Sequence, residues 1–178
     1  MTERDARKLI LRMHRGDELA AQQLWGFVAY RLVTYARVTL PTGMGSAAED
    51  VVQGVFLKVL KLRRGTLRGI GDGTAYLYQM TRNEALNYGR GETRERARRR
   101  ATPPIIQTAH DDRIEPVLKA ITELPSQQQD VLVLRYVGGL TIDQVVEVLG
   151  VNRNTVASRS RLGVERLRDV LKNEVHDD

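Results

Sequence analysis

A short run near the C-terminus carries polar side chains with the chemistry to bind nucleic acid. Asn154, Ser158 and Arg161 are spaced by four and three residues, so at about 100° per residue they fall on one face of a helix. Amide, hydroxyl and guanidinium groups can donate hydrogen bonds to phosphates or to base edges in a major groove. The solvated polar face of an ordinary bundle helix is the alternative interpretation. The apolar residues gather on the opposite side: Val156, Gly163, Val164, Leu167 and Leu171.

The elements that must position this face have the sequence pattern of a helix-turn-helix. Thr141 and Gln144 have the spacing of a capping box and predict a helix over 141–149. A short glycine turn follows, and Asn152 is placed to cap a second helix over 152–171. These paired signals favour DNA binding over a plain bundle helix. The residues of the first helix that we expect to face inward are Ile142, Val145, Val146 and Leu149.

Two further helices are predicted before this pair. Pro116 suits the first turn of a helix, and Pro125 ends it. Ser126 with Gln129 has the spacing of another capping box, which predicts a helix that ends at the glycine pair 138–139. We therefore expect one helical domain over residues 116–178.

The N-terminal half also shows helical periodicity, and we expect it to form a domain over residues 1–90. The segment 65–73 has four glycines and no period, which predicts a loop. Thr74 is expected to cap the helix after that loop. Along the third predicted helix, Val51, Val52, Val55, Val59 and Leu62 fall on the inward side. The predicted helices cover about residues 3–15, 17–40, 47–64 and 74–88.

Residues 91–115 lack this periodicity and are expected to form a linker. The linker contains most of an arginine run from Arg90 to Arg100, which is either a solvated segment or one that follows nucleic acid. With 42% hydrophobic but 5% aromatic residues, the core must be mostly Leu, Val, Ile and Ala, which suits packed helices. The predicted fold is therefore all-α, with two small helical domains joined by a flexible linker.

The composition excludes several kinds of site. The chain has no cysteine, which rules out disulfides, thiol catalysis and thiolate metal sites. His14, His110 and His176 lie far apart in the sequence, so we expect no zinc site, and nothing indicates another cofactor. No apolar run approaches the roughly 20 residues of a membrane helix, and we expect a soluble, cytoplasmic protein without membrane insertion. The net charge of +6 favours a polyanionic partner.

Two stretches of the chain resemble the bacterial sigma factors of RNA polymerase, most closely the extracytoplasmic-function class. In the N-terminal half, residues 48–56 and 76–83 look like region 2 of that family. The two similarities come in the family's order, and the resemblance implies a factor that binds core RNA polymerase, directs it to promoter DNA and is not an enzyme. The residues that look like region 4 are Leu124-Pro125, Gln129, Val131, Leu132, Leu134, Arg135-Tyr136, Gly139-Leu140-Thr141, Gly150-Val151 and 155–159.

The third predicted helix is where the resemblance implies a polymerase contact. Asp50, Gln53, Leu57 and Lys61 fall on the side away from its valines, and an exposed leucine beside an acid and an amide is typical of a protein contact. In the family this face docks on the clamp helices of the polymerase, with Asp50 and Gln53 at the matched positions. A merely solvated face is the alternative.

The resemblance also implies promoter contacts in both halves of the chain. In the family, the fourth helix and the loop before it open the minus-ten element and hold an unstacked base. Tyr76 and Tyr78 on this helix are either part of that site or core residues. The implied minus-ten residues are Gln79, Arg82, Asn83 and Arg90. The implied minus-thirty-five residues, on the second helix of the helix-turn-helix, are Arg153, Asn154, Thr155, Ser158, Arg159 and Arg161.

Five positions depart from the family's pattern. Ala47 and Gly54 stand where acids are frequent, which weakens the expected attraction to a basic polymerase surface. Ala157 and Leu162 stand at positions of the second helix that are often basic, and Ser160 replaces a usual core leucine. These last three departures bear on how the minus-thirty-five element is read.

Two other functions are compatible with parts of the sequence. A transcriptional regulator would use the helix-turn-helix on an operator without polymerase, but it would leave the Asp50 and Gln53 face without a role. A DNA-cleaving enzyme needs clustered carboxylates or an activated nucleophile, and the sequence shows no such cluster. Sigma factors of this class are commonly held inactive by an anti-sigma protein, and the resemblance alone implies that partner.

Overall fold

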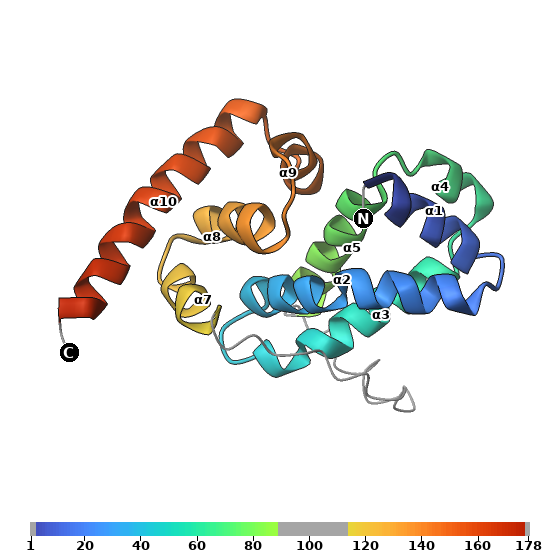
Figure 1. Cartoon of the computed structure of the whole chain (residues 1–178), viewed down its shortest axis with the longest axis horizontal. Helices are drawn as coiled ribbons and strands as arrows, with labels where there is room; N and C mark the ends of the chain where they lie inside the picture. Colours follow the sequence, from blue (N-terminus) through green and yellow to red (C-terminus); the bar gives the residue numbers. More distant parts are fainter. Residues whose placement is uncertain (1–2, 89–113, 177–178) are drawn as a thin grey trace. The chain divides into compact units, whose positions relative to one another are not determined.

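Helices make up all the regular structure that can be described for this protein. The computed structural model describes residues 3–88 and 114–176, and within these ranges every regular element is a helix (Figure 1). The predicted all-α fold is confirmed. The chain divides into two compact units, residues 1–108 and 109–178. None of the helices in the described ranges has the length and hydropathy needed to span a bilayer.

In the N-terminal unit, α2 and α5 lie at the centre of the packing. Helix α2 contacts α1, α3 and α5, and α5 also contacts α1 and α3. Asp17 caps α2 by accepting a hydrogen bond from the Ala20 N–H at 3.0 Å, and this bond lowers the pKa of the Asp17 carboxyl. Trp25 and Phe56 join α2 to α3 through an edge-on ring contact at 4.9 Å. The helices of this unit are α1 (Glu3–Met13), α2 (Glu18–Thr39), the short 3-10 helix η1 (Gly45–Ala47), α3 (Ala48–Leu60), α4 (Arg64–Gly69) and α5 (Gly73–Tyr88).

The segment between α3 and α5 differs from the prediction. Helix α3 ends at Leu60 rather than at residue 64, because the Lys61 N–H bonds back to the Lys58 and Val59 carbonyls and Arg63 is extended. The predicted glycine loop is wrong as well, since part of it forms α4. This short helix buries Leu67, and that burial outweighs the poor helix propensity of its glycines.

The predicted cap of α5 at Thr74 is also wrong. The Asp72 carboxylate, not Thr74, accepts the first free N–H groups of the helix, from Thr74 at 2.7 Å and Ala75 at 2.9 Å. Aspartate is among the preferred N-cap residues. The helix therefore starts at Gly73, two residues closer to α4 than a Thr74 cap would allow.

In the C-terminal unit, the long helix α10 packs on three others. It contacts α7, α8 and α9, and Figure 1 shows it running along one side of them. Pro116 lies in the first turn of α7, as predicted. The helices here are α7 (Glu115–Thr122), α8 (Ser126–Leu132), the π-helix η2 (Val133–Val137), α9 (Ile142–Leu149) and α10 (Arg153–His176).

One of the two predicted capping boxes is formed. Thr141 and Gln144 cap α9 reciprocally. The box at Ser126 is wrong, because the Gln129 side chain instead donates to the carbonyls of Thr122, at 2.8 Å, and Leu124, at 2.6 Å. Gln129 therefore closes the end of α7 rather than the start of α8, where Pro125 takes the N-cap position.

Candidate nucleic-acid interface

The helix-turn-helix consists of α9, a three-residue turn and α10. Gly150 ends α9 in the left-handed conformation, with φ of 65°, which glycine adopts without steric cost. The Asn152 side chain accepts the Thr155 N–H at 2.8 Å and so caps α10. Local backbone chemistry therefore fixes the angle at which α10 leaves the turn.

The first half of α10 presents a polar face to solvent. Arg153, Asn154, Ser158 and Arg161 are exposed, whereas Thr155 and Arg159 are half-buried. A shallow hollow of about 670 Å³ is lined by six residues, all of them polar or basic. Those residues are Asn152, Arg153, Asn154, Thr155, Ser158 and Arg159. Five of the six residues predicted for duplex binding thus lie around one surface, and Arg161 lies farther along the helix.

The opposite side of α10 is anchored by a few close contacts. Val156 is fully buried. A Cβ atom added to Gly163 would lie 3.1 Å from Leu132 Cγ, so α10 approaches α8 closely there. The Arg166 guanidinium also donates to the buried Gln128 side chain of α8 at 3.1 Å. Val164, Leu167 and Leu171, predicted on this side, are only half-buried.

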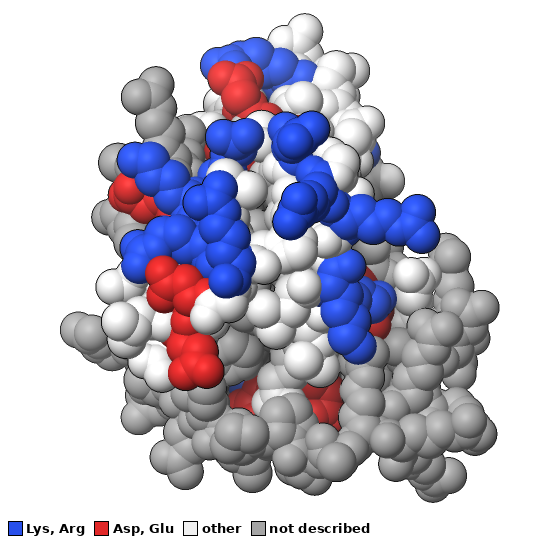
Figure 2. Space-filling view, turned by 90° about the vertical axis from the view of Figure 1, so that its right-hand side faces the viewer, with Lys and Arg blue, Asp and Glu red and all other residues white. Residues whose placement is uncertain are grey.

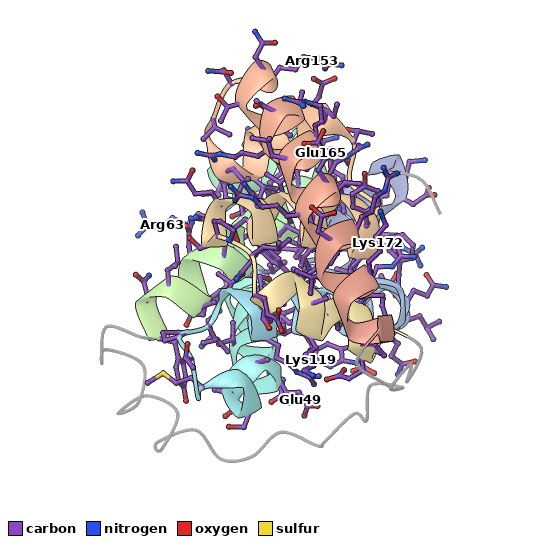
Figure 3. All side chains as sticks on the ribbon, turned by 90° about the vertical axis from the view of Figure 1, so that its left-hand side faces the viewer. Glu49, Arg63, Lys119, Arg153, Glu165 and Lys172 are labelled. Carbon is purple, nitrogen blue, oxygen red and sulfur yellow. The ribbon has the colours of Figure 1, made fainter. Side chains whose placement is uncertain are left out.

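Two of the predicted cations are paired with carboxylates. Arg153 forms an ion pair with Asp143 of α9, and Arg161 pairs with Glu165 at 3.1 Å, one turn along α10. All four side chains are more than half exposed, so solvent and salt screen these pairs and each contributes little stability. Figure 3 labels Arg153 and Glu165 on α10. Both arginines can therefore exchange a carboxylate for a phosphate at small cost.

In the N-terminal unit, α5 has only a narrow exposed stripe. Asn83 is exposed, and Gln79 and Arg82 are half-buried on the same stripe. Leu86 continues it with 37% exposure. Arg90, the fourth predicted minus-ten residue, lies outside the described residues.

The tyrosines of α5 differ in their surroundings. Tyr78 is buried and meets Tyr35 of α2 edge-on, with ring centroids 5.5 Å apart. Burial raises the pKa of the Tyr78 hydroxyl well above its usual range, and no group in the described part of the chain hydrogen-bonds to it. Tyr78 is therefore a core residue. Tyr76 is half-buried, and partial desolvation raises its pKa.

The predicted polymerase-docking face of α3 is less apolar than expected. Asp50 is exposed, Gln53 is half-buried, and Lys61 is exposed at the C-cap. Leu57 was expected to be exposed, but it is half-buried, because α3 contacts α2 and α5 on two sides. The exposed leucine of this helix is Leu60, at 44%.

Sequence reasoning missed two charged features of this unit. Lys58 of α3 forms an ion pair with Glu84 of α5, whose side chain is only 8% exposed. Arg63, Arg64 and Arg68 stand exposed around α4. Figure 2 views the side of the molecule that carries α1 and α4, and Lys and Arg side chains gather over that face. The predicted loop gave these arginines no common position, although three arginines within residues 63–68 already indicate a basic surface.

Comparisons with known proteins match both units. The family model for sigma-70 region 2 matches residues 21–95, and the model for sigma-70 region 4 matches residues 114–167. The ECF RNA polymerase sigma factor SigK of Mycolicibacterium vanbaalenii is 26% identical over 168 residues, which cover 86% of each chain. SigE of Mycolicibacterium smegmatis, also an ECF sigma factor, is 30% identical over 81% of this chain, which spans 56% of that relative's length.

Solved structures with a similar fold are related more distantly in sequence. CnrH, in a complex with the cytosolic domain of CnrY, has a TM-score of 0.66 and 20% identity, covering 95% of this chain and 98% of that chain. RpoE of Bartonella quintana, in a complex with the anti-sigma factor NepR, has a TM-score of 0.60 and 21% identity, covering 87% and 97%. These likenesses support the helical fold.

Proposed function

The chain belongs to the extracytoplasmic-function class of the sigma-70 family, and we propose that it binds core RNA polymerase and directs the enzyme to specific promoters. One observation carries this proposal: region 2 and region 4 both match, in the family's order, on two separate helical units. A helix-turn-helix alone would also suit many other regulators. Region 2 together with region 4 accounts for both polymerase and promoter contacts in one chain.

The polymerase contact is proposed for the exposed side of α3. Asp50 and Lys61 supply charges there, Gln53 supplies an amide, and the half-buried Leu57 supplies apolar area. A face of this kind is suited to a protein surface that is partly apolar and partly charged. Since Leu57 is half-covered, the adjacent exposed Leu60 is the better candidate for an apolar anchor.

The promoter contacts are proposed for α5 and α10. On α5, Gln79, Arg82 and Asn83 can hydrogen-bond an unpaired strand of the minus-ten element, and Arg90 extends the same stripe in the sequence. On α10, the surface around the shallow hollow suits the backbone and base edges of a duplex at the minus-thirty-five element. The residues proposed for α10 are Arg153, Asn154, Thr155, Ser158, Arg159 and Arg161.

The remaining parts of the proposal concern chemistry, partners and location. We propose that the protein has no catalytic activity of its own and works in the cytoplasm, where the polymerase and the promoters are. An anti-sigma protein is proposed as a further partner, because family members are often controlled in this way and RpoE was solved with one. The domain limits proposed from the sequence are residues 1–90 and 116–178, joined by the linker 91–115.

Run-off transcription with purified core polymerase tests the proposal. On a genomic library, the parent protein should direct initiation from a small set of start sites that share upstream elements, and it should co-elute with core enzyme. Asp50→Arg should weaken core binding by about tenfold or more, since one reversed charge at an interface costs on the order of 1–2 kcal/mol. Strong, specific duplex binding without polymerase, together with no co-elution, would instead support a regulator.

A further inference from the structure

Helix α1 is not accounted for by the functions proposed so far. Residues 3–13 precede both matched ranges, which cover residues 21–95 and 114–167. Ala6, Leu9, Ile10 and Met13 are buried, so one side of α1 is part of the core. Its other contacts reach a different part of the unit, the segment around α4.

Two side chains from the α1 region hold the two ends of α4. The Arg7 guanidinium donates from Nε to the Ile70 carbonyl at 2.6 Å, directly after the last residue of α4. The His14 ring, just past the end of α1, donates from Nε2 to the Leu62 carbonyl at 2.8 Å, two residues before α4 begins. A spacing of seven residues is about two helical turns, so both side chains lie on one side of α1.

The backbone of α1 also touches the start of α5. A Cβ atom at Gly73 would lie 2.4 Å from the Arg7 nitrogen and 2.8 Å from the carbonyl carbon of Ala6. Only glycine permits this approach without a shift of one helix. The position of α1 is therefore fixed against α5 by the same residue, Arg7, that holds the end of α4.

Helix α4 depends on this support. It has six residues, of which Leu67 alone is buried, and isolated helices of fewer than about 12 residues are marginal in water. Gly65 and Gly69 have open space around them and supply no packing. The contacts from α1 therefore determine where Arg64 and Arg68 are placed.

The two helices enclose a basic hollow of about 460 Å³. Leu11 and Leu67 supply the apolar part of its lining. The rest of the lining is basic and consists of three arginines and one histidine: Arg15, Arg64, Arg68 and His14. No acidic residue is among the lining residues. Arginines beside apolar side chains suit an unpaired nucleic-acid strand, because its phosphates bind cationic groups and its bases pack against apolar surface.

We propose that α1 belongs to the promoter-opening machinery, with Arg7 and His14 as positioning residues that hold α4 and its arginines in place for the unpaired strand. This inference rests on the proposed function, in which α5 contacts the minus-ten element, and it adds the segment before α5 to that site. Arg7 and His14 act through α4, and each does so through a backbone carbonyl. A conservative replacement that keeps the donor should therefore keep the role.

The first experiment measures α4 itself and needs no polymerase. Hydrogen exchange on the full chain should show faster exchange over residues 62–70 in His14→Ala, by about fivefold to tenfold for one lost hydrogen bond. Exchange in α2 and α3 should be unchanged. His14→Gln keeps an N–H donor and should restore most of the protection. Arg12→Ala is the matched control, because Arg12 lies on α1 but pairs with Asp17 at 2.8 Å.

The second experiment measures promoter opening with the reconstituted holoenzyme. On a promoter mapped by run-off transcription, permanganate reactivity of the minus-ten thymines should fall by about fivefold to tenfold in His14→Ala, whereas the affinity for core enzyme should stay within twofold. His14→Gln and a template with a pre-opened minus-ten region should both restore initiation.

Three results would overturn the inference. Unchanged exchange in α4 would show that His14 does not hold it. Equal losses of core binding and opening, not rescued by His14→Gln, would show a purely structural role. Normal opening despite faster exchange would show that the position of α4 is irrelevant. Failure of the parent holoenzyme to initiate would refute the proposed function instead, and the exchange result would still stand on its own.

Discussion

The two helices proposed to bind DNA, α5 and α10, are built in opposite ways. Helix α5 is enclosed by α1, α2 and α3, and only a stripe of it reaches solvent. Among residues 153–172 of α10, Val156 and Gly163 alone are buried. Changes on α5 should therefore disturb the fold and the function together, whereas most changes on α10 should alter binding without altering stability. The buried residues of α5 are Gly73, Ala75, Leu77, Tyr78, Thr81, Glu84 and Ala85.

The same contrast appears in how each helix uses a close glycine contact. At Gly73 the neighbouring atoms belong to the α1 backbone, whereas at Gly163 they belong to the Leu132 side chain. A backbone can move only if a whole helix moves, but a leucine can change its rotamer. We therefore expect a substitution by alanine to be tolerated at Gly163 but not at Gly73.

The largest effect is expected for Gly73→Ala. The new methyl group would overlap the Arg7 backbone and displace α1, with an expected loss of about 2–3 kcal/mol in the free energy of unfolding. Gly163→Ala should change it by less than about 1 kcal/mol, because the gain in helix propensity offsets the strain on Leu132. Urea denaturation followed by circular dichroism measures both.

Gly71→Ala is the control for that pair, since Gly71 has open space around it. Its free energy of unfolding should stay within about 0.5 kcal/mol of the parent value. Equal losses for Gly73→Ala and Gly163→Ala would contradict the contrast between the two helices.

A smaller effect is expected at the ion pair between α3 and α5. Lys58 is 42% exposed and Glu84 only 8%, so the two partners are not equivalent. Lys58→Met leaves a carboxylate buried without its cation and should cost about 1–2 kcal/mol after allowance for solvent near Lys58. Glu84→Gln leaves a lysine that reaches water, and it should cost less than about 1 kcal/mol.

Thermal denaturation of the two single variants and the double variant measures this asymmetry. The double variant should be closer in stability to Glu84→Gln than to Lys58→Met, because it no longer contains the buried charge. A greater loss in Glu84→Gln than in Lys58→Met would show that Glu84 is not the buried partner.

The sequence predicted the helix-turn-helix better than the segment around α4, and the reason is physical. The caps at Thr141 and Asn152 depend on residues three positions away, so a local pattern is sufficient to find them. Helix α4 has poor local propensity and forms because Leu67 is buried and α1 binds its ends. The partner residues Arg7 and Ile70 are 63 positions apart, and no local pattern reports such a contact.

In the candidate site, too, the features set by local sequence could be predicted, whereas those set by packing between helices could not. The polar face of α10 could be read from helical spacing, because little of that helix is covered by other elements. The exposure of Leu57 could not be predicted from the sequence, because it depends on how α2 and α5 pack against α3. The same holds for the Gln129 side chain. It donates hydrogen bonds to the carbonyls of Thr122, the last residue of α7, and of Leu124, two residues further on, instead of capping its own helix as predicted.

The smallest effect on stability, and a clear one on DNA binding, is expected at the exposed ion pair of α10. Arg153 and Asp143 are 62% and 77% exposed, so either change should alter the free energy of unfolding by less than about 0.5 kcal/mol. For the holoenzyme on a mapped promoter, binding constants are measured at several salt concentrations. In Arg153→Ala the slope of the logarithm of the binding constant against the logarithm of the salt concentration should become shallower by about one. Asp143→Asn removes the competing carboxylate and should tighten binding severalfold at low salt, with the difference shrinking as salt rises.

Lys119→Ala on α7 is the matched control for the loss of the Arg153 charge, because it also removes one cation from the C-terminal unit. Figure 3 shows Lys119 well away from Arg153. Its salt dependence should equal that of the parent. If all three variants gave the same salt dependence, the face around Arg153 would not contact phosphate. If Arg153→Ala also lost several kcal/mol of stability, α10 would be as tightly coupled to its unit as α5 is, and the contrast between the two helices would fail.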